Sequence, residues 1–406
     1  MFRISPRTSI SSASSGGSAG TSPEPSPPNS PTYVSKFDAI RKKSGDRQQH
    51  FKFQDDEHRQ KTPYLEGNLK FVHTIELSND IMCCLYSPDG SVLAVGLSDG
   101  IIKVLSTDTG KVHYSLSDDD IFSTSLPCTA IRFKPAAVGD TKVEHTHILV
   151  ATYSSGLVKF WHYTSGSCIH TINEAHQTLA LGFNPEHTKF ITAAADSTIN
   201  LYDEHTKQKI RVCEASDSKS VMDGHRLRVF AVQYHPHNTN QFVSGGWDDT
   251  VQFWDDRQRH AIRRLYGPHI CGDALDIDAK HDHLLTGSWR KENTLQIWDY
   301  GSGKKIKDVP QDLFHTSLHC NHYNTAKCKL YCAHWLGKEF MVCGGCEQNM
   351  VRVIDRGTLN TTGQLIDLPQ GAYTIDNDRI GMHPKLAIGS ARTIYILKHD
   401  QKINKS

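Results

Sequence analysis

The chain has 406 residues, of which 37% are hydrophobic and 22% charged, and its formal net charge is +1 at pH 7. This balance provides no global field for nucleic acid or an acidic membrane surface, so neither is an expected partner. No apolar run approaches the roughly 20 residues of a membrane-spanning helix, and the first residues lack the apolar stretch of a secretory signal. We therefore expect a cytoplasmic or nuclear protein whose 11 cysteines are reduced.

The amino-terminal segment is poor in apolar residues. From Ser9 to Thr32 it consists mainly of Ser, Gly and Pro, which bury too little apolar surface to offset the entropy lost on ordering. We predict a disordered tail over residues 1–65. Ser22, Ser26 and Ser30 each precede a proline, and Ser44 follows three basic residues, so this tail offers sites for kinases as well as ordinary linker chemistry. Its Arg and Ser content also allows a mitochondrial transit peptide, which Pro6 and the glycines disfavour.

After Asn68 the sequence consists of short β-rich runs separated by Gly, Asp, Asn and Ser, and these runs recur as seven units. The first unit contains MCCLYSPDGSVLAVGLSDGIIKVLS and the fourth contains VFAVQYHPHNTNQFVSGGWDDTVQFWD. A period of about 40 to 50 residues with four strands is the signature of propeller blades. We predict an all-β, seven-bladed propeller over residues 66–400 and a short tail over residues 401–406.

The first and last repeat units predict how the ring closes. The seventh unit ends after three strands, near Lys398, while an unassigned strand, KFVHTIEL, precedes the first unit. If this segment supplies the missing outer strand, both ends of the chain join one blade and no long edge remains unpaired.

The repeated units resemble WD repeats, most clearly the fourth, and the resemblance covers roughly residues 69–400. Gly224 and His225 match the Gly-His pair, and Ser244, Asp248 and Trp254 match the hydroxyl, the turn acid and the Trp of the Trp-Asp pair. In the family such His, Ser, Asp and Trp side chains form a buried hydrogen-bonded chain, which the resemblance implies here as a structural network. The fifth unit repeats the pattern with His269, Thr286, Glu292 and Trp298.

The sequence does not favour an enzymatic function for these residues. His225, Ser244 and Asp248 are the ingredients of a hydrolytic triad, but their spacing matches the network within a blade, and no GxSxG motif accompanies them. The run YGSGKK lies between two strands and lacks the first glycine of a phosphate-binding loop. We therefore predict that the protein is not an enzyme and needs no cofactor.

The sixth unit is rich in possible zinc ligands, including Cys320, His322, Cys328, Cys332 and His334, followed by a CGGC pair. A tetrahedral zinc site needs four ligands that converge. The CGGC pair replaces SGGW and TGSW of the neighbouring units, where cysteine is a small packing residue. We predict no metal site.

The resemblance also implies which residues project from the narrow upper face, where many WD-repeat proteins hold peptides. Arginines and indoles there suit an acidic or phosphorylated segment, because Arg donates bidentate hydrogen bonds and Trp gives a rigid apolar contact. The alternative is that these are scattered surface residues. The candidates are Arg226, Arg228, Trp247, Trp289, Arg290 and Lys291.

The segment FVSGGWDDTVQFWDDR resembles the extended WD box of substrate receptors of cullin-type ubiquitin ligases, in which a WDxR ending docks onto the ligase adaptor. Arg257 is the informative residue, since the rest of the box is what any well-formed blade requires. The predicted function is a non-catalytic scaffold that binds other proteins within a larger intracellular complex. The alternative is a ligase substrate receptor that binds the adaptor through Arg257.

Overall fold

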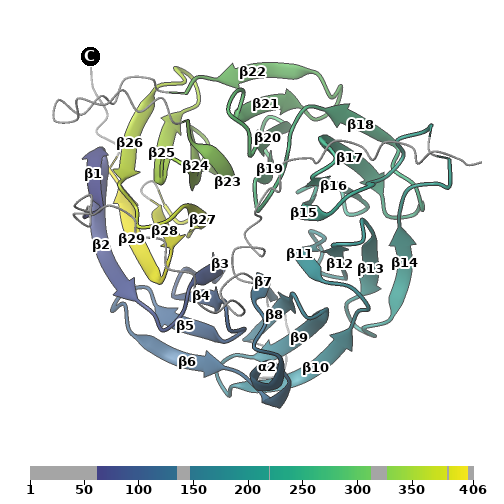
Figure 1. Ribbon diagram of the computed structural model, residues 1–406, viewed down its shortest axis with the longest axis horizontal. Coiled ribbons are helices and arrows are strands. Elements are labelled where there is room, and N and C mark those ends of the chain that lie inside the picture. The colour runs from purple at the N-terminus through teal and green to yellow at the C-terminus, as the bar shows by residue number, and fades with distance from the viewer. Residues whose placement is uncertain (1–61, 135–146, 219, 312–326, 382–383, 401–406) are drawn as a thin grey trace, which may run out of the picture. The chain divides into compact units, whose positions relative to one another are not determined.

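The computed structural model describes residues 62–134, 147–218, 220–311, 327–381 and 384–400. The predicted tail up to residue 61 and the segment 401–406 lie outside these ranges. The described strands form seven antiparallel sheets, which follow one another around a central axis (Figure 1). The predicted seven-bladed propeller is confirmed.

Six blades contain four consecutive strands each, with the first strand innermost (Figure 1). The blades are, in order, β3 (Ile81–Tyr86), β4 (Val92–Leu97), β5 (Ile102–Ser106) and β6 (Val112–Leu116); β7 (Cys128–Lys134), β8 (Ile148–Tyr153), β9 (Leu157–His162) and β10 (Ser167–Asn173); β11 (Thr178–Phe183), β12 (Lys189–Ala194), β13 (Ile199–Asp203) and β14 (Lys209–Cys213); β15 (Val229–Tyr234), β16 (Gln241–Gly246), β17 (Thr250–Asp255) and β18 (Arg263–Tyr266); β19 (Leu275–Asp278), β20 (His283–Gly287), β21 (Leu295–Asp299) and β22 (Lys305–Val309); β23 (Lys329–Leu336), β24 (Phe340–Cys346), β25 (Met350–Asp355) and β26 (Thr361–Ile366).

The seventh blade closes the ring as predicted. It combines β27 (Ala372–Asn377), β28 (Lys385–Ser390) and β29 (Thr393–His399) with β2 (Leu69–Glu76), which pairs antiparallel with β29. The inner strands of neighbouring blades contact one another around the whole ring, and β27 contacts β3. Both ends of the propeller are therefore hydrogen-bonded within one blade.

A short strand that the repeat pattern did not reveal precedes β2. β1 (Tyr64–Gly67) pairs antiparallel with β26 and makes blade six five-stranded. Tyr64 and Leu65 fall on the tail side of the expected boundary at residue 66, and the structure places them in this strand. β1 and β2 together connect blades six and seven.

Burial explains the residue pattern of the strands. The second strand of a blade consists mainly of apolar residues because it is covered on both faces. In β8, for example, every residue is buried. The outer strand is mostly exposed, as in β10. Apolar side chains between adjacent blades form the core, and between blades three and four this core includes Ile191, Val232 and Trp254.

Strand direction defines two faces of the ring. Because the strands alternate in direction, turns of the β16–β17 type and the connections between blades lie at one end, which we call the upper face. Turns of the β15–β16 and β17–β18 types lie at the other end, the lower face. The connection between blades one and two contains the helix α2 (Asp119–Thr124). No helix of the described residues is long and apolar enough to cross a membrane.

Candidate functional site

Blade four contains a continuous hydrogen-bonded chain across its first three strands. The imidazole of His225 contacts the Asp248 carboxylate through Nδ1 at 2.9 Å and the Ser244 hydroxyl through Nε2 at 2.7 Å. The indole N–H of Trp254 donates to the same hydroxyl at 2.7 Å. Ser244 and Trp254 are fully buried, so this hydroxyl bridges two side chains inside the blade and does not face a substrate.

Asp248 closes this chain at the upper turn. Its carboxylate also accepts hydrogen bonds from the Arg226 backbone N–H at 3.0 Å and from the Thr250 hydroxyl at 2.8 Å. Burial raises the pKa of Asp248, but the hydrogen bonds and charge of His225, with the other two donors, outweigh this effect and hold the pKa below its usual range.

Blade three replaces the imidazole with a carboxylate, which the sequence comparison did not reveal. Glu174 precedes Pro185 by the same spacing as His225 precedes Pro236, and this spacing was the available signal. The buried carboxylate of Glu174 accepts four hydrogen bonds: from Thr178 at 2.8 Å, Thr192 at 2.6 Å, Asn200 at 3.1 Å and Tyr202 at 2.5 Å.

Blade five forms only half of the network expected from its sequence. Trp298 donates to Thr286 at 2.9 Å, as expected. His269 instead contacts Asp249 of blade four at 2.8 Å, and Glu292 pairs with Lys327 while its side chain is 77% exposed. The turn of blade five contains two more residues than that of blade four, which carries Glu292 away from the blade interior.

The upper-face arginines of blade four have partners within the protein. The Arg226 guanidinium donates to the backbone carbonyls of Ser216, Ser218 and Val221 and thereby holds the loop that precedes β15. Arg226 is therefore engaged in the fold. Arg228 donates to the side chain of Gln177 in blade three at 3.1 Å.

Two half-buried indoles on the upper face each carry a cation. The Arg228 guanidinium lies 5.6 Å from the ring centre of Trp247, which packs against Phe230 at 5.3 Å. The Lys329 ammonium lies 4.3 Å from the ring centre of Trp289. Both contacts are within the range of cation–π attraction.

Trp289 belongs to an aromatic series that continues into blades six and seven. Its ring centre lies 6.4 Å from that of Tyr331, which lies 5.0 Å from that of Tyr373. Phe230, Tyr331 and Tyr373 each occupy the one-residue bulge of an inner strand near its upper end. The sequence analysis did not select these tyrosines, although their equivalent positions in the repeats were a usable signal.

Arg290 and Lys291 differ in their environment. Arg290 forms an ion pair of 2.6 Å with Asp249, so it joins the upper turns of blades four and five together with His269. Lys291 is exposed beside Trp289. The structure thus gathers Arg228, Trp247, Trp289 and Lys291 on the upper face, whereas Arg226 and Arg290 mainly fix loops.

Arg257 lies at the opposite end of β17, on the lower face. Its guanidinium donates two hydrogen bonds to the Asp255 carboxylate, at 2.8 and 2.5 Å, while its side chain is 69% exposed. These hydrogen bonds lower the pKa of Asp255. Arg257 is therefore held in one orientation without being buried.

Family models identify several of these repeats. The WD domain, G-beta repeat, matches residues 166–203 and 216–255, and the WD40 domain of anaphase-promoting complex subunit 4 matches residues 66–127. The chain contains WD repeats within a seven-bladed β-propeller. The segment 216–255 contains all residues of the hydrogen-bonded chain of blade four. The segment 166–203 contains Glu174, which takes the place of His225 in blade three.

Three relatives of this WD-repeat protein illustrate the range of the family. They are WD repeat-containing protein 89 homolog of Dictyostelium discoideum (24% identical over 249 residues, 60% of this chain and 62% of the relative), ribosome biogenesis protein YTM1 of Scheffersomyces stipitis (26% over 207 residues, 50% and 42%) and target of rapamycin complex subunit wat1 of Schizosaccharomyces pombe (27% over 171 residues, 42% and 51%). The matched segments span less than two thirds of each of these relatives.

The cysteines of blade six have packing roles in the structure. Cys320 and His322 lie outside the described residues. Cys332 is fully buried and donates weak hydrogen bonds to the carbonyls of Gly344 and Ala372, each at 3.5 Å. The part of the chain that the structure describes brings no three His, Cys, Asp or Glu side chains into a metal-binding arrangement.

Proposed function

We propose that this WD-repeat protein is a non-catalytic scaffold that holds an acidic segment of a partner protein on its upper face, within a larger complex. The observation that carries the proposal is the pair of half-buried indoles, Trp247 and Trp289, each capped by a cation. Lys329 is already paired with Glu347 and is 12% exposed, so an acidic side chain of the partner pairs with Arg228 or with the exposed Lys291. Its neighbours cover the indoles, which combines charge complementarity with apolar contact.

The relatives support assembly as a general role. One is named a ribosome biogenesis protein and another a subunit of the target of rapamycin complex. Propellers supply broad rigid surfaces whose loops select the partner, so the fold suits this role while leaving the partner to the surface residues. Lys291, which is exposed beside Trp289, adds a further cation to this surface.

The proposal is tested by affinity purification of the full chain with quantitative mass spectrometry. We expect Trp247→Ala and Trp289→Ala to remove the same partners, because each truncation deletes an anchor and releases its cation. Ile210→Ala, which changes an exposed side chain of β14, is the matched control and retains them. A partner set unchanged in both Trp variants would refute the upper-face assignment.

The ligase-receptor function is the second candidate, favoured by the exposed and oriented guanidinium of Arg257. Binding of a ligase adaptor through this residue predicts that Arg257→Ala abolishes co-purification of the adaptor, while Trp247→Ala preserves it. Absence of the adaptor from the wild-type preparation, or its retention by Arg257→Ala, removes this candidate.

A further inference from the structure

Blade six shows that an outer blade edge of this protein accepts an additional strand. β1 pairs with β26 from Tyr64↔Ile366 to Gly67↔Gly363, and the Asn68 N–H donates to the Thr362 carbonyl at 2.9 Å. Residues of an antiparallel strand direct their backbone groups alternately to its two neighbours. The backbone of Gln364 therefore faces β1, where it lies opposite Glu66.

The outer strand of blade four presents an equivalent edge. Arg264 of β18 lies opposite Gln252 as Gln364 of β26 lies opposite Arg352. The Gly267 N–H donates to the Asp249 carbonyl of the preceding turn, so by alternation the backbone groups of Arg264 and Tyr266 point away from β17. Within the described ranges, β18 is the last strand of its sheet.

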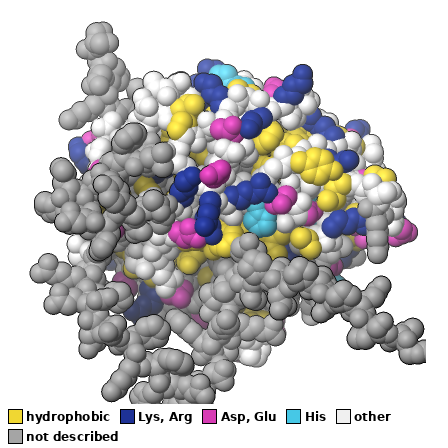
Figure 2. Space-filling view, turned by 45° about the horizontal axis from the view of Figure 1, so that its top comes forward, with side chains coloured by type: hydrophobic (Ala, Val, Ile, Leu, Met, Phe, Trp, Pro, Cys, Tyr) yellow, Lys and Arg dark blue, Asp and Glu magenta, His cyan; other side chains and the backbone are white. Residues whose placement is uncertain are grey.

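The side chains along this edge are basic. In the part of the chain that is described, no carboxylate lies within ion-pair distance of Arg263 or Arg264. Arg264 donates from Nε to the Tyr266 hydroxyl at 2.6 Å and lies over its ring, and Tyr266 is 59% exposed. Figure 2, which brings the β22 side of the ring forward, shows Lys and Arg side chains together with Asp and Glu side chains and exposed hydrophobic ones.

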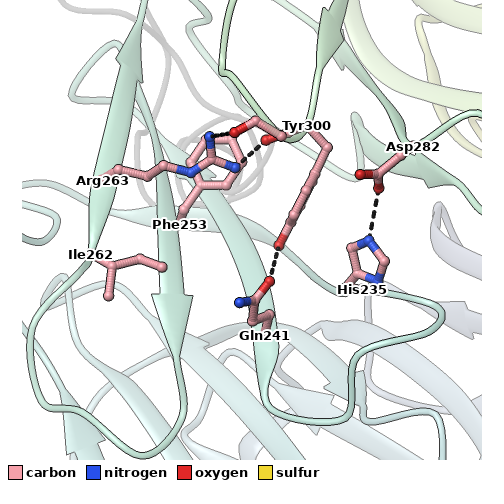
Figure 3. Close-up of a pocket in the computed structure, with 8 residues that line it drawn as sticks. His235, Gln241, Phe253, Ile262, Arg263, Asp282 and Tyr300 are labelled. Atoms are coloured by element: carbon pink, nitrogen blue, oxygen red, sulfur yellow. Dashed lines mark hydrogen bonds and ion pairs between the residues drawn. The ribbon is translucent and has the colours of Figure 1, made fainter.

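A pocket of about 360 Å³ adjoins the beginning of β18, between blades four and five (Figure 3). Phe253 and Tyr300 supply apolar walls, and the half-exposed Ile262 lies at the rim. The Arg263 guanidinium lies 3.9 Å from the ring centre of Phe253 and donates to the carbonyls of Tyr300 and Gly301. The pocket thus combines apolar walls with the Arg263 cation, and the Asp282 carboxylate in its lining is paired with His235 at 2.8 Å.

We propose that the outer edge of β18 binds an extended acidic segment of a partner protein as a fifth antiparallel strand, and that one apolar side chain of this segment enters the adjoining pocket. Backbone hydrogen bonds supply affinity in this mode of recognition, and the side-chain contacts supply specificity. An acidic residue opposite Arg264 occupies the place that Glu66 has opposite Gln364 in blade six. Arginines also discourage pairing with basic or apolar strands, so the edge selects an acidic one.

The test uses the full chain and a fluorescent acidic hexapeptide, Glu-Val-Glu-Leu-Glu-Val, with Lys-Val-Lys-Leu-Lys-Val as its charge-reversed counterpart. Fluorescence anisotropy measures affinity, and hydrogen exchange locates the bound peptide. We expect the acidic peptide to bind and to protect the amides of Arg264 and Tyr266, while the control Ile210→Ala, on the exposed side of β14, leaves its affinity unchanged.

Two variants separate pairing from charge. Arg264→Pro removes an outward N–H while leaving the ladder to β17, because proline is tolerated at an edge position that donates to solvent. It should weaken the acidic peptide about fivefold, as expected for one lost hydrogen bond. Arg264→Glu keeps the backbone and should reverse the preference toward the lysine peptide.

Three results would overturn the proposal. The first is that the acidic peptide does not bind the wild type. The second is that both Arg264 variants bind the acidic peptide with the affinity of the wild type. The third is a dimer of the full chain that Arg264→Pro dissociates, which would assign the edge to a second copy of this chain. Loss of partners in Trp247→Ala, or their retention, bears on the upper face and leaves this test independent.

Discussion

Blade four places the imidazole of His225 between a carboxylate and a hydroxyl, whereas blade three places the carboxylate of Glu174 at the same position. In blade four the hydrogen bonds run as a chain from Asp248 to Trp254. In blade three one carboxylate accepts from four side chains. The position therefore requires a group that satisfies the hydroxyl of the second strand and the polar donor of the third, and either chemistry meets that need.

The largest effect is expected when the carboxylate of blade three is removed. Glu174→Ala leaves the donors of Thr178, Thr192, Asn200 and Tyr202 without their common acceptor in a buried site. We expect the free energy of unfolding to fall by about 4 kcal/mol, measured by urea denaturation. The exposed substitution Lys291→Ala serves as control, and a loss below about 1 kcal/mol for Glu174→Ala would contradict the comparison.

His225→Ala should have a smaller effect. Asp248 keeps the Arg226 N–H and the Thr250 hydroxyl, and Ser244 keeps the indole N–H of Trp254. We expect a loss of about 2 kcal/mol in the same denaturation experiment. A loss equal to or larger than that of Glu174→Ala would show that the hydrogen bonds of blade four depend on His225 as much as those of blade three depend on Glu174.

The pH dependence of stability tests whether Asp248 of blade four is ionised in the folded protein. A carboxyl whose pKa is lower in the folded than in the unfolded state, as for Asp248, stabilises the fold fully above about pH 4. This contribution disappears as the pH falls through the folded-state pKa. The difference in unfolding free energy between wild type and Asp248→Asn should therefore shrink from pH 5 toward about pH 2. If the difference in unfolding free energy between wild type and Asp248→Asn did not change with pH, the lowered pKa of Asp248 would be contradicted.

The smallest effect is expected at the turn acid of blade five. Glu292→Ala should change the unfolding free energy by less than about 0.5 kcal/mol, because its ion pair with Lys327 is exposed. The matched substitution Asp248→Ala in blade four should cost several times as much, since its hydrogen bonds are buried. Equal losses at both sites would mean that blade five forms the buried network after all.

The fold was predictable because the repeat period and the missing seventh outer strand are properties of the whole sequence. The hydrogen-bonded chain of blade four was predictable from a family resemblance at four positions. The sequence did not reveal Glu174, because a carboxylate does not match the His of the pattern. It also did not reveal β1, because four residues contain no repeat. The inward role of Arg226 depends on three backbone carbonyls of a loop, and no residue pattern encodes their positions.

The most direct test of the upper-face proposal is zero-length carbodiimide cross-linking of the full chain with its co-purified partner, followed by mass spectrometry. This reagent joins amines to carboxylates in direct contact. We expect cross-links from the exposed Lys291, beside Trp289, to Asp or Glu residues of one partner segment. Cross-links to the partner that arise solely from outer-strand lysines such as Lys209 and Lys305 would contradict the upper face as the binding surface.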